Sequence, residues 1–141
     1  VFIFDVGSDG LVEVGKSADE FQQNAIAIDT SSKLVASNQW NEINVWNEDL
    51  SASRSYGWAY HTSRILSMKW SPSEQYLATA GADKQIIVWR DFEKFKPRPL
   101  LLTEVFTLGV NDFDWIDEET LIAVGEDGCL KRIKITAPLA L

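Results

Sequence analysis

The sequence has very few of the side chains that build disulfides and metal centres. Its 141 residues contain one cysteine, Cys129, and one histidine, His61. A lone cysteine cannot close an intramolecular disulfide, and no second thiol or imidazole accompanies it at the spacing of a metal site. We therefore expect no metal and no disulfide framework, which is typical of proteins in a reducing compartment.

Long apolar runs and an excess of positive charge are also missing. The apolar stretches, such as residues 100–102, are far shorter than the roughly 18 residues that a membrane helix needs. Thirteen basic and 21 acidic residues give a formal net charge of −8, so no long-range field attracts nucleic acid or an anionic membrane. We expect neither as a partner. What is present is 45% hydrophobic residues, with six tryptophans, enough for a sizeable core.

An internal repeat organises the chain. The residue that ends each unit recurs at intervals of 42, 43 and 44 residues, at Phe4, Trp46, Trp89 and Ile133. A second column precedes the end of its unit by 18 or 19 residues, at Ile28, Trp70 and Trp115. The four tryptophans on these columns are predicted to fill the core. A repeat of roughly 40–45 residues is typical of propeller blades.

Within each unit the pattern is that of short strands. In residues 65–70, Met68 and Trp70 fall on one face and Ser67 and Lys69 on the other, an alternation of period two. Turn signals such as residues 71–73 and 81–83 separate the runs, and nothing requires a helix. The fold class is therefore predicted to be all-β, with four antiparallel strands in each blade.

The repeat divides the chain into the end of one blade and three further blades. Their boundaries are predicted at residues 1–14, 24–56, 64–104 and 109–135. Propellers close with about four to eight blades, so we expect an incomplete propeller or a fragment of a larger one. The rest of its own propeller, or another chain, would close the ring. The start without methionine, on a strand-like run, also indicates a piece of a longer protein.

The middle unit resembles the WD-repeat family residue by residue. His61 stands where that family has Gly-His, residues 71–72 are its Ser-Pro, and Trp89 ends its third strand. The resemblance implies a structural hydrogen-bonded tetrad of His61, Thr79, Asp83 and Trp89. The other units depart from it: one has Trp40 in place of the turn aspartate, and the last keeps Asp127 without a histidine. Packing alone is expected to hold the turns of those two units.

Three stretches resemble the C-terminal part of the actin-interacting protein 1 family: residues 24–28, 60–65 leading into 70–72, and 115–121 leading into 125–127. This resemblance implies a cytoplasmic, cytoskeletal protein of two propellers that binds actin filaments decorated with cofilin and promotes their disassembly. The alternative is a WD-repeat scaffold subunit of another complex, of the signalling or ubiquitin-ligase type. In both, the chain is a protein-interaction module with no chemistry of its own.

The sequence offers little for catalysis. His61 is the only candidate for acid–base work near neutral pH, and no nucleophile motif or second histidine accompanies it. The glycines form neither a phosphate-binding loop nor a dinucleotide fingerprint, so no cofactor and no enzyme activity are expected. The acidic cluster of residues 112–119 is interpreted as solvated or as flanking a blade. Within it, Asp114 is predicted to pair with Lys69 of the preceding blade.

Two tryptophans, Trp40 and Trp58, fall on no repeat column. Both belong to loops that a WD-repeat propeller presents on one rim, and aromatic residues there have the composition of a protein-binding hot spot. The candidate partner-binding residues are Phe21, Trp40, Asn41, Trp58, Tyr60 and Arg64. The alternative for Trp58 is that its side chain is buried beneath its own loop.

Overall fold

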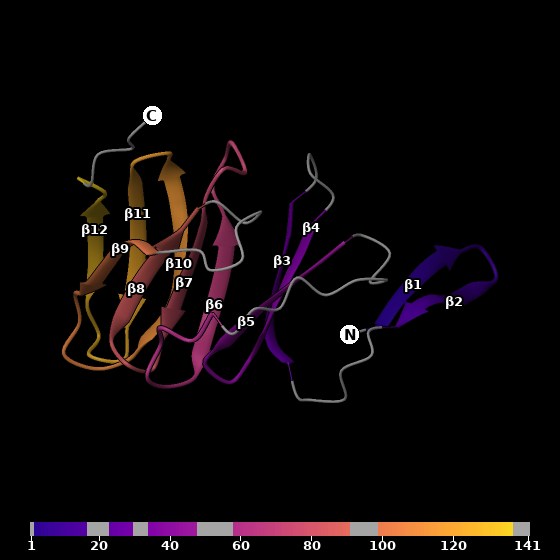
Figure 1. Cartoon of the computed structure of the whole chain (residues 1–141), viewed down its shortest axis with the longest axis horizontal. Coiled ribbons are helices and arrows are strands. Elements are labelled where there is room, and N and C mark those ends of the chain that lie inside the picture. The colour runs from indigo at the N-terminus through magenta and orange to yellow at the C-terminus, as the bar shows by residue number, and fades with distance from the viewer. Residues whose placement is uncertain (1, 17–22, 30–33, 48–57, 91–98, 137–141) are drawn as a thin grey trace.

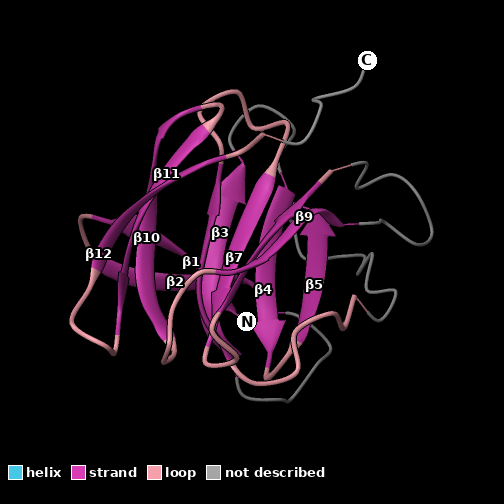
Figure 2. Cartoon of the chain, turned by 90° about the vertical axis from the view of Figure 1, so that its left-hand side faces the viewer, coloured by secondary structure: helices cyan, strands magenta, loops and turns pink. Residues whose placement is uncertain are grey.

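A computed structural model describes residues 2–16, 23–29, 34–47, 58–90 and 99–136. These residues form strands joined by turns and loops, without a helix (Figures 1 and 2). The strands are β1 (Phe2–Gly7), β2 (Gly10–Lys16), β3 (Gln23–Asp29), β4 (Leu34–Gln39), β5 (Glu42–Asn47), β6 (Ile65–Trp70), β7 (Leu77–Gly81), β8 (Gln85–Trp89), β9 (Pro99–Glu104), β10 (Val110–Asp117), β11 (Thr120–Gly125) and β12 (Leu130–Lys134). The described part therefore contains no membrane-spanning helix.

The strands make four antiparallel sheets that follow the chain order. The sheets are β1-β2, β3-β4-β5, β6-β7-β8-β9 and β10-β11-β12. The three larger sheets stand face to face as blades, and the β1–β2 hairpin lies at one end (Figure 1). The prediction of an all-β fold built from propeller blades is confirmed, and the described strands form an open row rather than a closed ring.

The β6–β9 sheet is buried on both faces because it stands between two other blades. One face, with Leu77, Ile87 and Trp89, packs against residues of β3–β5 in a first core. The opposite face, with Ala78 and Val88, packs against β10–β12 in a second core. Neighbouring residues of β7 and β8 thus alternate between two cores, as the period of two requires. The result is a rigid central blade.

The first full blade has a hairpin register that differs from the repeat column. Trp46 of β5 pairs with Val35, whereas its counterpart Trp89 pairs with Leu77. A repeat of 43 residues would make Leu34 the counterpart of Leu77, but the observed pairing puts Val35 in that place, one residue further along β4. The cause is the β4–β5 turn, which has two residues between its strands where the β7–β8 turn has three.

A polar seam joins β6 to β10. The Ser67 hydroxyl donates to Asp112 Oδ1 at 2.6 Å, and the Lys69 ammonium lies 3.2 Å from Asp114 Oδ2. The indole N–H of Trp115 donates to the Lys69 carbonyl at 3.1 Å. The predicted pair of Lys69 with Asp114 is thus confirmed. Asp112 and Asp114 flank a blade, as one reading of the acidic cluster required.

Candidate functional site

Four side chains of the central blade are joined by hydrogen bonds in its interior. The His61 Nδ1 lies 2.9 Å from Asp83 Oδ2, and its Nε2 lies 2.8 Å from Thr79 Oγ1. The Trp89 Nε1 donates to the same Thr79 oxygen at 2.9 Å. His61, Thr79 and Trp89 are all buried. The structure therefore brings together the four residues that the WD-repeat resemblance named.

The chemistry of the four groups orders the protons along this chain. A carboxylate only accepts, so the proton between His61 and Asp83 belongs to His61 Nδ1. In the neutral ring Nε2 is then an acceptor, and the Thr79 hydroxyl donates to it while accepting from Trp89. Both ring nitrogens of His61 are occupied and enclosed. The arrangement supports a role in holding the blade and gives His61 no open nitrogen for a substrate.

Asp83 links this chain to the backbone of the surrounding loops. Its carboxylate accepts from the amides of Thr62 at 2.8 Å and Gln85 at 3.3 Å, in addition to His61. Burial raises the pKa of Asp83, but the hydrogen bond and electrostatic interaction with His61, together with these amides, outweigh burial and lower the pKa below 3.8. Gly81 allows the approach, because a Cβ there would lie 2.6 Å from Asp83 Oδ1.

The last blade has a similar hydrogen-bonded aspartate in the turn between its second and third strands. Asp127 accepts from the Thr107 amide at 3.1 Å, the Thr107 hydroxyl at 2.9 Å and the Cys129 amide at 3.0 Å. The Thr107 amide lowers the pKa of Asp127 most, and with Cys129 it outweighs desolvation to give about 2. The expectation that packing alone holds this turn is wrong, since Asp127 is bound by the amide and hydroxyl of Thr107, which corresponds to Thr62 of the central blade.

A buried asparagine fastens the first full blade. The Asn38 Oδ1 accepts from the Ala25 amide at 2.7 Å, and its Nδ2 donates to the carbonyls of Trp40 at 3.1 Å and Ile65 at 3.4 Å. Asn38 is 0% exposed and ties β4 to β3, to its own turn and to β6. The expectation of packing alone is wrong here too. The sequence contained one signal for this role. Asn38 is a polar residue on the same face of β4 as Leu34 and Ala36, which is otherwise apolar.

The exposed side of these fastened loops carries the candidate partner-binding residues. Trp40 is 58% exposed and Tyr60 is 45% exposed, and Arg64 is also exposed. The half-buried Asn41 donates from Nδ2 to the His61 carbonyl at 2.9 Å, which joins the β4–β5 turn to the segment before β6. We refer to Trp40, Asn41, Tyr60 and Arg64 as the aromatic rim.

Trp58 is not part of this rim, so its placement among the partner-binding residues is wrong. Its side chain is 2% exposed and stacks on Trp89, with ring centroids 5.9 Å apart and planes at 20°. Its backbone bridges to Ile43, which draws the loop over the first core. Tyr60 touches the other side of this cluster, edge-on to Trp89 at 5.6 Å. Phe21 lies outside the described residues.

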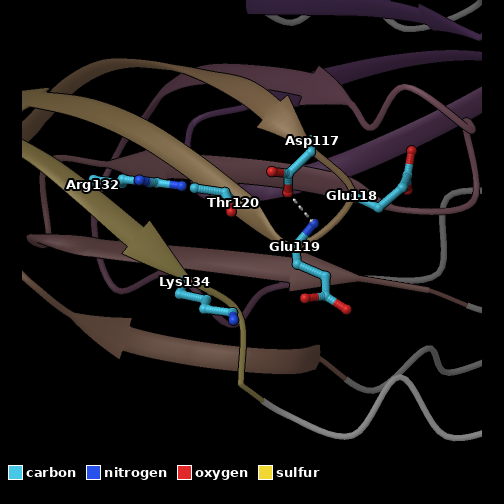
Figure 3. Close-up of a pocket in the computed structure, with 6 residues that line it drawn as sticks. All are labelled: Asp117, Glu118, Glu119, Thr120, Arg132 and Lys134. Carbon is cyan, nitrogen blue, oxygen red and sulfur yellow. Dashed lines mark hydrogen bonds between the residues drawn. The ribbon is translucent and has the colours of Figure 1, made fainter.

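A charged hollow lies where β10 turns into β11 and β12 ends. Its lining has both signs of charge: Asp117, Glu118, Glu119, Thr120, Arg132 and Lys134 (Figure 3). The amide of Glu119 donates to Asp117 Oδ1 at 2.8 Å and is the main cause of the lowered pKa of Asp117. No group of three metal-ligating side chains occurs among the residues that the structure describes. The hollow thus presents charged groups of both signs at the surface.

Repeated antiparallel blades, a Ser-Pro turn and the His61–Asp83 fastening define a WD-repeat propeller protein. Residues 54–90 match the family model described as WD domain, G-beta repeat, so this part of the chain is a WD repeat, a module of protein interaction. Its similarity to actin-interacting protein 1, expected from three sequence stretches, is confirmed by the relatives that follow.

The chain is 29% identical over 107 residues to Actin-interacting protein 1 of Caenorhabditis elegans, covering 75% of this chain and 16% of that protein. It is 31% identical over 108 residues to the 66 kDa stress protein of Physarum polycephalum, covering 76% and 18%. Actin-interacting protein 1-2 of Arabidopsis thaliana is 25% identical over 133 residues, covering 92% and 21%. The chain thus spans roughly a fifth or less of each relative's length.

Proposed function

We propose that this chain is a non-enzymatic binding module of an actin-regulating WD-repeat protein. It binds actin filaments decorated with cofilin and contributes to their disassembly in the cytoplasm. The observation that carries the proposal is an exposed tryptophan, Trp40, held on a rim whose backbone is fastened by buried hydrogen bonds. The choice of partner is supported by the name of the relatives, two of which are called actin-interacting proteins.

The fastened loops suit a binding role because they reduce the entropic cost of association. A rim that is ordered before it meets a partner loses few side-chain and loop conformations on binding. The tetrad fixes the segment that carries Tyr60, and Asn38 fixes the turn that carries Trp40. An exposed tryptophan, tyrosine and arginine are the residue types that contribute most to protein interfaces.

The enclosure of His61 supports a module without catalysis. Its ring nitrogens contact Asp83 and Thr79, and its side chain is buried. An acid–base catalyst must reach its substrate within hydrogen-bonding distance. Substrate screening with generic hydrolase substrates is expected to give no turnover above that of a His61→Ala variant.

Cosedimentation tests the proposed partner. The purified chain is incubated with actin filaments, with and without saturating cofilin, and centrifuged. We expect the chain to appear in the pellet in the presence of cofilin and to stay mostly in the supernatant without it. If it remains soluble with decorated filaments, the actin assignment is wrong and a scaffold role in another complex replaces it.

A further inference from the structure

We propose that Trp40 is a preorganised anchor that inserts its indole into an apolar pocket of a protein partner, and that the shortened β4–β5 turn exists to present it. The proposal rests on the proposed binding function and adds the residue and the chemistry by which binding occurs. It depends on three features of the turn: its backbone conformation, its fastening and its charge surroundings.

The backbone of the turn is unusual for the residue it carries. Trp40 has a φ of 55°, whereas Asn41, the second residue of this two-residue turn, does not have a positive φ. That combination belongs to the tight hairpin turn whose first position is normally glycine, because a side chain there is strained. In the three-residue β7–β8 turn the positive φ falls on Lys84 instead. Strain at Trp40 therefore requires an explanation.

Burial of the indole does not provide that explanation. The Trp40 side chain is 58% exposed, while the core tryptophans Trp46 and Trp89 are 2% and 0% exposed. A large aromatic side chain that is both strained and exposed stabilises the isolated fold little. Strain of this kind concentrates at functional sites, which favours a contact made only in a complex.

Three hydrogen bonds hold the backbone of the turn that carries Trp40. The Trp40 carbonyl accepts from the Ile65 amide at 2.8 Å and from Asn38 Nδ2 at 3.1 Å. The side chain of Asn41 donates to the His61 carbonyl. Because Ile65 and His61 belong to the next blade's segment, the turn is tied across the blade boundary. The indole is thus presented from a fixed backbone.

The charge around the turn favours a protein over nucleic acid or membrane. Glu42 is exposed directly after the turn, and the whole chain carries a formal net charge of −8. Phosphates and anionic headgroups are repelled by that charge. The exposed Arg64 lies next to Ile65, whose amide holds Trp40, so charges of both signs stand beside the indole, as suits the polar border of a pocket in a protein partner.

The first test measures the folded state alone. Replacing Trp40 by glycine, the residue this turn position prefers, is expected to leave the melting temperature unchanged or to raise it, because strain is relieved and no core contact is lost. Trp58→Ala, which removes a buried indole, is the matched comparison and is expected to lower it strongly. A drop of more than about 4 °C for Trp40→Gly would make the indole structural and overturn the proposal.

The second test measures binding with actin filaments decorated by cofilin as the probe. Trp40→Gly is expected to weaken binding at least about tenfold. The control, Ile116→Ala, removes an apolar side chain that is 51% exposed at the far end of β10, and is expected to bind like wild type. Unchanged affinity of Trp40→Gly overturns the anchor but leaves the proposed function standing. Absent binding by wild type overturns the proposed function and the anchor with it.

Sedimentation with lipid vesicles tests whether the indole binds a protein or a lipid surface. Neutral phosphatidylcholine vesicles replace the filaments in the same sedimentation experiment. We expect neither wild type nor Trp40→Gly to sediment with them. Wild-type sedimentation that is lost in Trp40→Gly would assign the indole to a lipid surface and overturn the protein partner.

Discussion

The hydroxyl of Thr79 lies between two buried rings and accepts a hydrogen bond from the Nε1 of Trp89 at 2.9 Å. Because the same oxygen contacts His61 Nε2, one small side chain satisfies two aromatic heterocycles. Removing this hydroxyl would leave both ring nitrogens without it as a hydrogen-bond partner. Each buried polar group that loses its partner costs about 1–3 kcal/mol of stability.

Thr79→Val is expected to destabilise the protein by about 2–5 kcal/mol. The substitution preserves shape but leaves the Trp89 N–H and His61 Nε2 without the hydroxyl. Thr79→Ser, which keeps the hydroxyl, is the control and is expected to cost about 1 kcal/mol through the lost methyl group. Chemical denaturation monitored by tryptophan fluorescence measures both. Equal stability of the two variants would show that the hydroxyl contributes nothing.

The stability of the protein is expected to fall in acid partly through Asp83. The pKa of Asp83 is lowered in the folded state, so its stabilisation is present above its ordinary value of 3.8. It is lost as the pH falls from that value through the lowered folded-state pKa. Thermal melts from pH 5 downward are expected to decline less steeply for Asp83→Asn than for wild type. If the melting temperatures of the two proteins fall equally with pH, Asp83 does not contribute to the loss of stability in acid.

Asn38→Ala is expected to destabilise the protein by about 2–4 kcal/mol, because it removes three hydrogen bonds from a buried position. The loss has a local signature: the amide of Ala25, whose acceptor is Asn38, should lose protection from hydrogen exchange. Asn41→Ala removes one half-buried hydrogen bond and should leave that amide protected. Undiminished protection of Ala25 in Asn38→Ala would contradict the fastening.

Reversing the charge at the polar seam is expected to cost about 0.5–1 kcal/mol. Asp114→Lys replaces the contact with Lys69 by repulsion, and both groups are partly exposed, so the effect is modest. High salt should reduce it. Glu119→Lys makes the same change in net charge without touching this pair and serves as the control. A melting temperature of Asp114→Lys equal to that of the control would dispose of the ion pair's contribution.

Much of the fold follows from features that repeat along the chain. Strand alternation and the two columns were sufficient to predict blades and the pairing of Lys69 with Asp114, because equivalent positions of neighbouring blades face each other. The β4 register was not predictable in this way. It depends on the β4–β5 turn, which is one residue shorter than the β7–β8 turn.

The residues outside the repeat columns were the difficult ones. Trp58 and Trp40 look alike in sequence, as aromatic residues in loops, yet one is buried and the other exposed. The difference arises from the stacking of Trp58 on Trp89 and its bridge to Ile43, contacts between residues far apart in the chain. Asn38 was missed because its partners are backbone groups, which no side-chain motif reveals.

The proposed function requires that this chain bind actin filaments that carry cofilin. The most direct measurement is the dissociation constant of the labelled chain for bare and for cofilin-decorated filaments, titrated side by side. We expect at least about tenfold tighter binding to decorated filaments, a difference of about 1.4 kcal/mol. Equal affinity for the two kinds of filament, or no binding to either, would contradict it.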